Sequence, residues 1–257
     1  MPSELQTLLT TGLFAWILVF ARVGTAFMSL PGIGEAFVAA RVRLLLALLV
    51  SALLVPGLLP QLPAMPTQPF SLALLVGGEV FYGAFIGLLA RLIVATVEVA
   101  GMIIAMQISL SNASVFNPAM AAQSSLTSAL LGITALVLLF ATDLHHLLLL
   151  AVADSYTVFR PGIAPQFGDF ASAYAQLLSQ SFVVATQLAA PLIILGLVFY
   201  LGLGLMSRLM PQLQIFFIAI PAQIYLGLLV LGLTLSTLML LWLRYAQETL
   251  QGFLDIR

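Results

Sequence analysis

The sequence is poor in charge and contains neither cysteine nor lysine. Of its 257 residues only 7% are charged and 62% are hydrophobic, whereas a soluble domain carries about 25% charged residues. So little charge cannot cover the surface of a water-soluble globule, and the composition therefore predicts an integral membrane protein. The absence of cysteine excludes disulfides and thiolate metal sites. A formal net charge of −1 argues against a nucleic-acid-binding surface.

Catalytic patterns are missing as well. No G-x-S-x-G, Walker-type or paired-carboxylate arrangement occurs, and the serines of the central segment have no nearby general base. We therefore expect no enzymatic activity and no cofactor. Asp143, His145 and His146 are close in sequence, but adjacent histidines point to different faces of a helix and no H-E-x-x-H spacing exists. We expect no metal here and place these residues near a membrane interface.

Six hydrophobic runs dominate the chain. A spanning helix needs about 20 mainly apolar residues. The runs cover about residues 8–30, 44–59, 70–100, 126–152, 174–206 and 213–245. The N-terminus lacks a basic region, so we expect the first run to stay in the mature protein. Prolines at 56, 60, 63, 66 and 69 predict a rigid, extended connector.

Charge placement conflicts with simple up-and-down spanning. If six segments alternate, one side of the membrane carries Arg41 and Arg43 of the first connection, Arg91 towards the end of the third segment and Arg208 between the last two. The positive-inside tendency makes that side cytoplasmic. Arg244 and Arg257 then fall on the opposite side. Because Pro191 and Pro221 also interrupt the last two runs, we expect bent helices in an all-α membrane protein.

Glu79 precedes two glycines, Gly83 and Gly87, at the G-x-x-x-G spacing that lets helix backbones approach closely. Contact with a partner chain and packing within this chain remain equal alternatives. Glu79, Arg91 and Glu98 are costly at membrane depth and should pair or face water. Since they do not form a line of carboxylates that would carry protons, we interpret them as members of an interfacial or intersubunit salt bridge.

The segment from Gly101 to Ser125 is neutral and polar, and it holds three methionines. Lipid cannot satisfy irregular backbone or amide side chains, so this segment must be buried in protein or line a watery cavity. A neutral polar loop suits a pore that must close and reopen, and methionine repacks easily around a moving chain. A re-entrant loop of a small-solute transporter and a polar helix between neighbours are the alternatives. Residue chemistry alone does not separate the three.

Four blocks in order resemble the FliR family of flagellar export-gate proteins, which is called SctT in the related virulence secretion systems. The blocks are Pro31-Gly32 followed by RVRLLLALLVSALLVP, then EVFYGAFIGLLARL, AGMIIAMQISLSNASVFNP and LGLGLMSRLMPQLQIFFIAIPAQIYLGLLVL. The last contains R-x-x-P-Q and a later I-P that are similar to the family's most recognisable pattern. Asn117 stands where the family often has Asp, and of an Asn-Gly-His pattern only His146 matches.

The resemblance implies one FliR-type export-gate domain over residues 1–257, built of bent helical hairpins within a helical complex. Such a protein helps to form and plug the channel through which unfolded flagellar proteins leave, in the bacterial inner membrane at the flagellar basal body. Implied partners are five copies of FliP, with FliQ, FlhB and FlhA, besides membrane lipid. A virulence-type export gate and, more distantly, a small-solute secondary transporter are the alternative functions.

The resemblance also implies two sets of functional residues. The plug loop covers about residues 106–118, with Met106, Gln107, Ser109, Ser111, Asn112, Ser114, Phe116, Asn117 and Pro118 as its candidate residues. The candidates for helix packing or partner contact are Glu79, Gly83, Gly87, Pro211, Gln212 and Pro221.

Overall fold

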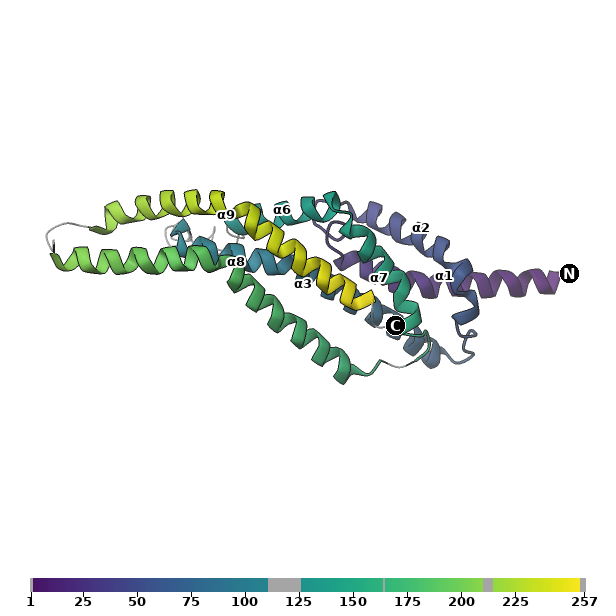
Figure 1. Cartoon of the computed structure of the whole chain (residues 1–257). Coiled ribbons are helices and arrows are strands. Elements are labelled where there is room, and N and C mark those ends of the chain that lie inside the picture. The colour runs from purple at the N-terminus through teal and green to yellow at the C-terminus, as the bar shows by residue number, and fades with distance from the viewer. Residues whose placement is uncertain (1, 111–125, 164, 210–214, 255–257) are drawn as a thin grey trace. The chain divides into compact units, whose positions relative to one another are not determined.

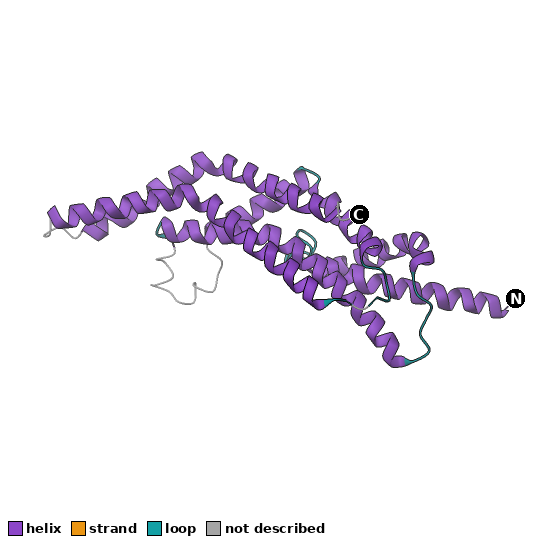
Figure 2. Ribbon diagram, turned by 60° about the horizontal axis from the view of Figure 1, so that its bottom comes forward, coloured by secondary structure: helices purple, strands orange, loops and turns teal. Residues whose placement is uncertain are grey.

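The computed structural model describes residues 2–110, 126–163, 165–209 and 215–254 of the chain. Over these residues the elements are helices joined by loops, and they contain no strand (Figure 2). Five helices in this part are long and apolar enough to cross a membrane, or up to six if one bent pair counts as a single span. The predictions of an all-α membrane protein and of about six hydrophobic segments are confirmed.

The helices follow one another along the chain as Figure 1 labels them. They are α1 (Pro2–Ser29), α2 (Ala40–Leu58), the short 3-10 helix η1 (Leu59–Gln61), α3 (Pro69–Gln107), α6 (Leu126–Ala141), α7 (Leu144–Val158), α8 (Phe167–Leu209) and α9 (Ile215–Leu254). With its 39 residues, α3 would be about 58 Å long if straight, about twice the thickness of the bilayer's hydrocarbon core. Because α8 and α9 have 43 and 40 residues, these three helices must tilt, bend or extend beyond the bilayer.

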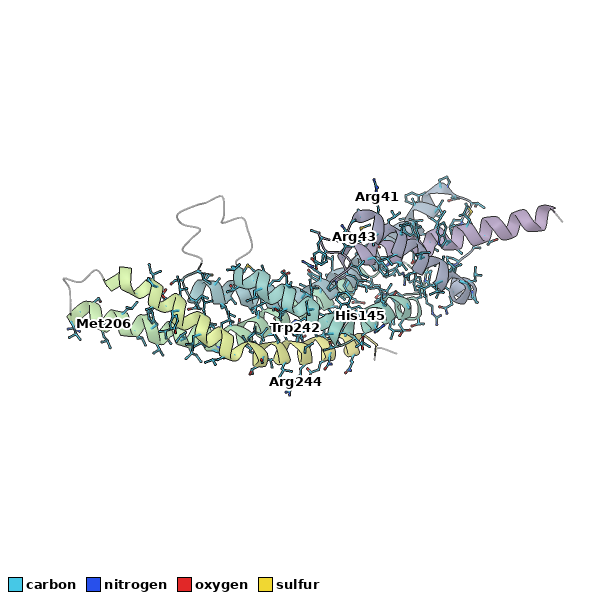
Figure 3. The ribbon with its side chains drawn as sticks, turned by 90° about the horizontal axis from the view of Figure 1, so that it is seen from above. Arg41, Arg43, His145, Met206, Trp242 and Arg244 are labelled. Carbon is cyan, nitrogen blue, oxygen red and sulfur yellow. The ribbon has the colours of Figure 1, made fainter. Side chains whose placement is uncertain are left out.

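The connector after α2 is shorter than predicted. Pro56 lies inside α2 and Pro60 lies in η1, so only the following residues up to 68 are non-helical. Pro56 is close to the helix end, and the amide of Leu59 still reaches the carbonyl of Val55. The helix therefore tolerates a proline that removes a single hydrogen bond. At its other end α2 begins at Ala40, so that Arg41, predicted in a turn, belongs to the first turn of the helix and projects from it (Figure 3).

The fourth hydrophobic run, predicted over about residues 126–152, is broken into two helices. The first of them, α6, ends at Ala141, and α7 begins at Leu144 and continues to Val158. Asp143 stands at the break with a φ of 58°, in the left-handed region that Asp and Asn enter more readily than most residues. One left-handed residue thus redirects the chain at this point.

The chain divides into two compact units, which we describe separately. Unit 1 comprises Met1–Leu92, Asp143–Leu177 and Glu248–Arg257, and unit 2 comprises Ile93–Thr142 and Leu178–Gln247. The helices α3, α8 and α9 each contribute residues to both units. The single domain over residues 1–257 stays a prediction.

Each unit has its own core. In unit 1, one face of α1 is buried as a stripe of apolar residues with helical spacing, to which Leu18, Val23 and Ala26 belong. Arg22 lies within this stripe and is equally buried. In unit 2, the buried Trp242 of α9 donates its indole N–H to the carbonyl of Ile93 in α3 at 2.9 Å. Both cores therefore include a polar group that is satisfied inside the unit.

Candidate functional site

The candidate plug loop begins inside α3. Met106 and Gln107 form the last helical residues, so the helix continues further than the apolar pattern predicts. After Ile108 the chain leaves the helix at Ser109, whose φ of 61° lies in the left-handed region. This conformation is uncommon for a residue with a side chain, and it is a frequent way to end a helix.

One glutamine of α9 holds this helix end. The hydroxyl of Ser109 donates to Oε1 of Gln223 at 2.8 Å, and Nε2 of Gln223 donates to the backbone carbonyl of Gln107. Ser109 is 5% and Gln223 4% exposed, so both groups are shielded from solvent and from lipid. We call Gln107, Ser109 and Gln223 the amide cluster. It supplies the hydrogen bonds that irregular backbone in an apolar setting requires.

Two glycines allow this close approach within unit 2. A Cβ atom added to Gly196 of α8 would meet Oε1 of Gln107. One added to Gly227 of α9 would lie 2.6 Å from Cβ of Ile108, closer than such atoms approach in proteins. The end of α3 therefore fits against α8 and α9 only because both positions lack a side chain.

Met102 and Met106 lie four residues apart on α3 and are 44% and 65% exposed. Four residues is about one helical turn, so both side chains point to the same side of the helix. They face away from the core of unit 2, where flexible apolar side chains can pack against another chain. The exposed methionines and the buried amide cluster thus occupy different sides of the helix end.

Several predicted site residues lie outside the described residues. They are Ser111, Asn112, Ser114, Phe116, Asn117 and Pro118 of the plug loop, and Pro211 and Gln212 of the partner-contact set. Pro221 is described: it is exposed and lies inside α9, two residues before Gln223. Its missing N–H removes one hydrogen bond from the helix next to the amide cluster. The plug and partner-contact roles stay predictions.

Sequence reasoning did not single out Gln223. Its only local signal is a lone amide in the apolar run that follows Pro221. An amide side chain within a membrane helix usually bonds across to another helix, so the residue itself was detectable. Its partners were not, because they lie 114 and 116 positions earlier in the chain.

Glu79 is paired with an arginine of α1 in unit 1. Nε of Arg22 lies 2.7 Å from Oε2 of Glu79, and Nη2 lies 3.1 Å from Oε1. The guanidinium also donates to the carbonyl of Ser155 at 3.0 Å and to that of Phe159 at 2.9 Å. It stands 4.0 Å from the ring centre of Tyr156, in reach of a cation–π interaction. We call Arg22, Glu79, Ser155 and Tyr156 the arginine cluster.

The glycine pair after Glu79 contacts α1 of the same chain. A Cβ on Gly83 would meet the carbonyl of Arg22 and the hydroxyl of Thr25, and one on Gly87 would lie 2.8 Å from the carbonyl of Ala26. Close packing within the chain is therefore what the described residues show for this face of α3. It brings α1 near enough for the arginine cluster to form.

Arg91 and the backbone of α3 near Glu98 also make contacts. Nη1 of Arg91 contacts Oε1 of Glu35, an ion pair at the surface of unit 1. In unit 2 the backbone carbonyl of Glu98 accepts a hydrogen bond from Ser128 at 2.8 Å, and Thr127 donates to the carbonyl of Gly101 at 2.7 Å. These contacts join α3 to α6.

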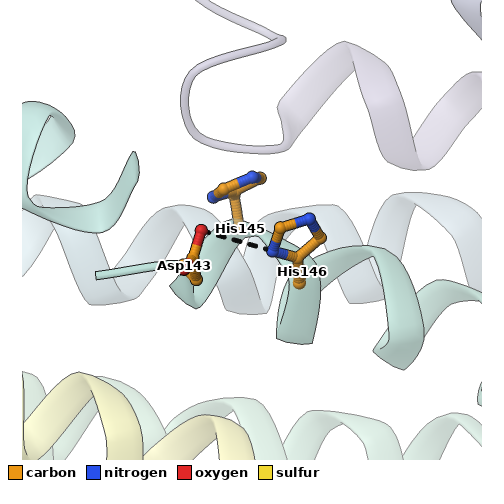
Figure 4. Close-up of side chains that lie close together, drawn as sticks. All are labelled: Asp143, His145 and His146. Atoms are coloured by element: carbon orange, nitrogen blue, oxygen red, sulfur yellow. Dashed lines mark ion pairs between the residues drawn. The ribbon is translucent and has the colours of Figure 1, made fainter. Parts of the chain in front are cut away.

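Asp143, His145 and His146 come together at the bend between α6 and α7 (Figure 4). Nδ1 of His146 lies 3.5 Å from Oδ1 of Asp143, and the two imidazole centres are 4.1 Å apart. One ligand atom from each residue lies within 4.8 Å of the others, so the three can hold a cation. Our expectation that the adjacent histidines diverge was wrong, because both belong to the first turn after the left-handed Asp143. The absence of a metal stays a prediction.

Residues 13–249 match the family described as bacterial export proteins, family 1. The flagellar biosynthetic protein FliR of Caulobacter vibrioides is 42% identical over 236 residues, which cover 92% of this chain and 94% of that protein. FliR of Bacillus subtilis is 30% identical over 87% of both chains. The Yop proteins translocation protein T of Yersinia pestis is 34% identical over 63% of this chain and 65% of that protein.

Proposed function

This chain belongs to family 1 of the bacterial export proteins, and we propose from that membership that it is a component of the flagellar type III protein export gate in the bacterial inner membrane. The similarity that carries the proposal is the 42% identity to FliR of Caulobacter vibrioides along nearly the whole of both chains. The five to six membrane-spanning candidates agree with a multi-pass membrane protein. Its role is structural and conductive, without enzymatic chemistry or a cofactor.

The partners follow from the same family. The chain assembles with five copies of FliP, with FliQ, and with FlhB and FlhA, and it passes unfolded flagellar proteins. The exposed apolar side chains of unit 2 support such an assembly: Leu197, Leu201 and Leu233 are 61%, 62% and 76% exposed. Lipid and partner helices are the two environments that cover such side chains.

Within that assembly the segment after α3 serves as the plug. The amide cluster supports this role because it fixes where the chain leaves α3 and uses neutral groups only. Neutral amides and hydroxyls bond to protein in one state and to water in another without leaving a buried charge. The methionines exposed beside it provide an adaptable apolar contact.

Genetic complementation tests the flagellar function. The gene is expressed in a Caulobacter strain that lacks its own FliR, and swimming in soft agar is measured together with the amount of chain in the membrane fraction. Restored swimming is the expected result. No swimming despite normal insertion would count against the proposal and favour a virulence-type export gate. The partial similarity to Yop translocation protein T supports that alternative.

Native mass spectrometry tests the assembly. The chain is co-expressed with FliP and FliQ, and a complex with one copy of this chain among several partner chains is expected. A lone monomer, under conditions that preserve such complexes, would revive the small-solute transporter.

A leak assay tests the plug. Replacing residues 112–117 by a Gly-Ser linker of equal length should raise ion leakage through the assembled complex. Unchanged leakage and unchanged secretion would refute the plug role while leaving the assembly intact.

A further inference from the structure

Unit 1 contains a cavity of about 450 Å³ between α3 and α7. Its inner wall is formed by aromatic and aliphatic side chains, among them Tyr82, Phe85, Leu89 and Leu148. Ligand sites in proteins measure about 300–1,000 Å³ and are mostly apolar with a few placed polar groups. The cavity therefore has the size and the lining of a site for an apolar molecule.

The first turns of α8 cover one side of the cavity. The ring of Phe170 lies 4.6 Å from that of Phe85 in α3 and 5.1 Å from that of Phe159 at the end of α7, measured between ring centres. Aromatic pairs at these distances stabilise each other beyond simple burial. The cover is thus held by specific contacts and is part of the fold of unit 1.

The rim of the cavity carries charges of both signs. Arg160 and Asp169 line it and are exposed, and Asp154 lines it at the end of α7. These residues stand in or beside the short connector between two membrane-spanning candidates, α8 and the bent pair that ends with α7. A connector between two spans lies outside the hydrocarbon core, and we assign this rim to the level of the lipid headgroups.

We propose that this cavity binds one acyl chain of a zwitterionic phospholipid of the phosphatidylethanolamine type. The phosphate is bound by Arg160, because a guanidinium donates paired hydrogen bonds to phosphate oxygens. The ammonium group faces the carboxylate of Asp169. A purely anionic headgroup such as phosphatidylglycerol would place its phosphate near two carboxylates without an ammonium to offset them, so the rim discriminates between the two lipids. This site is independent of the plug.

Lipid binding to the full chain, with the partners it retains in mild detergent, provides the test. After delipidation the complex is titrated with phosphatidylethanolamine or phosphatidylglycerol, and bound lipid is counted by native mass spectrometry. We expect one tightly held phosphatidylethanolamine per copy of this chain. Arg160→Gln should weaken its binding about tenfold, since a charge-assisted hydrogen bond is lost. Asp169→Asn should reduce the difference in affinity between phosphatidylethanolamine and phosphatidylglycerol.

A cavity-filling variant separates the cavity from the general lipid-facing surface. Ala151→Phe places a ring into the cavity and should abolish the tight lipid, whereas Leu240→Phe, at an exposed position of unit 2, should leave it unchanged. Equal lipid retention in both variants would overturn the proposal, and so would equal affinity for the two headgroups. If Ala151→Phe releases a partner chain while the tight lipid stays, the cavity seats protein and the proposal is wrong.

Labelling of the unaltered chain does not depend on how the variants fold. Phosphatidylethanolamine with a photoreactive group at the end of its acyl chain is added to the complex, irradiated, and mapped by peptide mass spectrometry. Labels should concentrate in residues 82–90 and 148–158. Labels spread evenly over the exposed leucines of α8 would refute the site.

Discussion

Replacing Glu79 by leucine should destabilise unit 1 strongly, because Arg22 would lose its only carboxylate partner among the described residues. Glu79 is 1% exposed and accepts two hydrogen bonds from the guanidinium, at 2.7 and 3.1 Å. The oxygens of Ser155 and Phe159 would remain, but they carry no full negative charge. Removing one partner of a buried ion pair costs about 3–5 kcal/mol, and we expect Glu79→Leu to fall in this range.

The free energy of unfolding can be measured by titrating the chain from a mild detergent into sodium dodecyl sulfate and following tryptophan fluorescence. The double variant Arg22→Met/Glu79→Leu is the decisive control. It removes both charges together, and since replacing a whole buried pair by apolar residues is often close to neutral, it should cost less than Glu79→Leu alone. Arg41→Leu, at an exposed position of α2, should cost less than about 0.5 kcal/mol.

The order of these variants decides whether the reasoning holds. A loss below about 1 kcal/mol for Glu79→Leu would place the pair among weak surface salt bridges. If the double variant lost as much unfolding free energy as Arg22→Met and Glu79→Leu lose when added together, the two side chains would not depend on each other. Either result would refute the claim that the arginine cluster joins α1, α3 and α7 through a compensated buried charge.

Three further outcomes follow from the close contacts. Gln223→Leu should raise ion leakage through the assembled complex, because it removes two hydrogen bonds at the end of α3. Gln247→Leu, at an exposed position of the same helix, is its control. Equal leakage in both variants would contradict the role of the amide cluster. Gly227→Ala should cost about 1–3 kcal/mol by overpacking, while Gly232→Ala, where an added Cβ meets nothing within 4 Å, should be neutral or slightly stabilising in the same unfolding assay. Gly83→Leu should separate α1 from α3 and reduce the amount of folded chain in membranes, which is measured by the resistance of the chain to a protease. Unchanged resistance would contradict the close contact at Gly83.

The helical class and the number of apolar segments could be predicted because hydropathy alone decides them in a membrane. Helix ends were harder. We predicted that the third run ends near Ala100, yet α3 continues to Gln107, since residues 102–106 are all apolar. At its end the backbone carbonyl of Gln107 accepts a hydrogen bond from Gln223 of α9. Whether a polar residue ends a helix or belongs to it depends on partners that lie elsewhere in the sequence.

The arginine cluster illustrates the same limit for the candidate sites. Glu79 was recognised as a costly charge with an unknown partner, but nothing in the sequence pattern pointed to Arg22 as that partner. Arg22 and Glu79 are 57 positions apart in the sequence. Gly83 lets α3 pack closely against α1, which brings Glu79 within reach of Arg22. The bend at Asp143 is a different case, since it depends on one residue in a left-handed conformation that several residue types can adopt. Nothing in the neighbouring residues distinguishes this aspartate from one in a regular turn.

The two polar clusters differ in chemistry in a way that fits different mechanical tasks. Separating the arginine cluster would leave a charge in an apolar core, at a cost of several kcal/mol, so α1, α3 and α7 stay joined in unit 1. Each bond of the amide cluster contributes only about 0.5–1.5 kcal/mol, and in the plug proposed above water would replace both of them when the pore opens. For the proposed plug, a release that costs about 1–3 kcal/mol in total would keep the open form at about 0.6–16% without a substrate. A chain that binds the open form more tightly than the closed form can then shift this population, whereas a charged cluster at the same place would require far more differential binding. The neutral chemistry at the end of α3 is therefore the one expected of a contact that must open for passage and close afterwards.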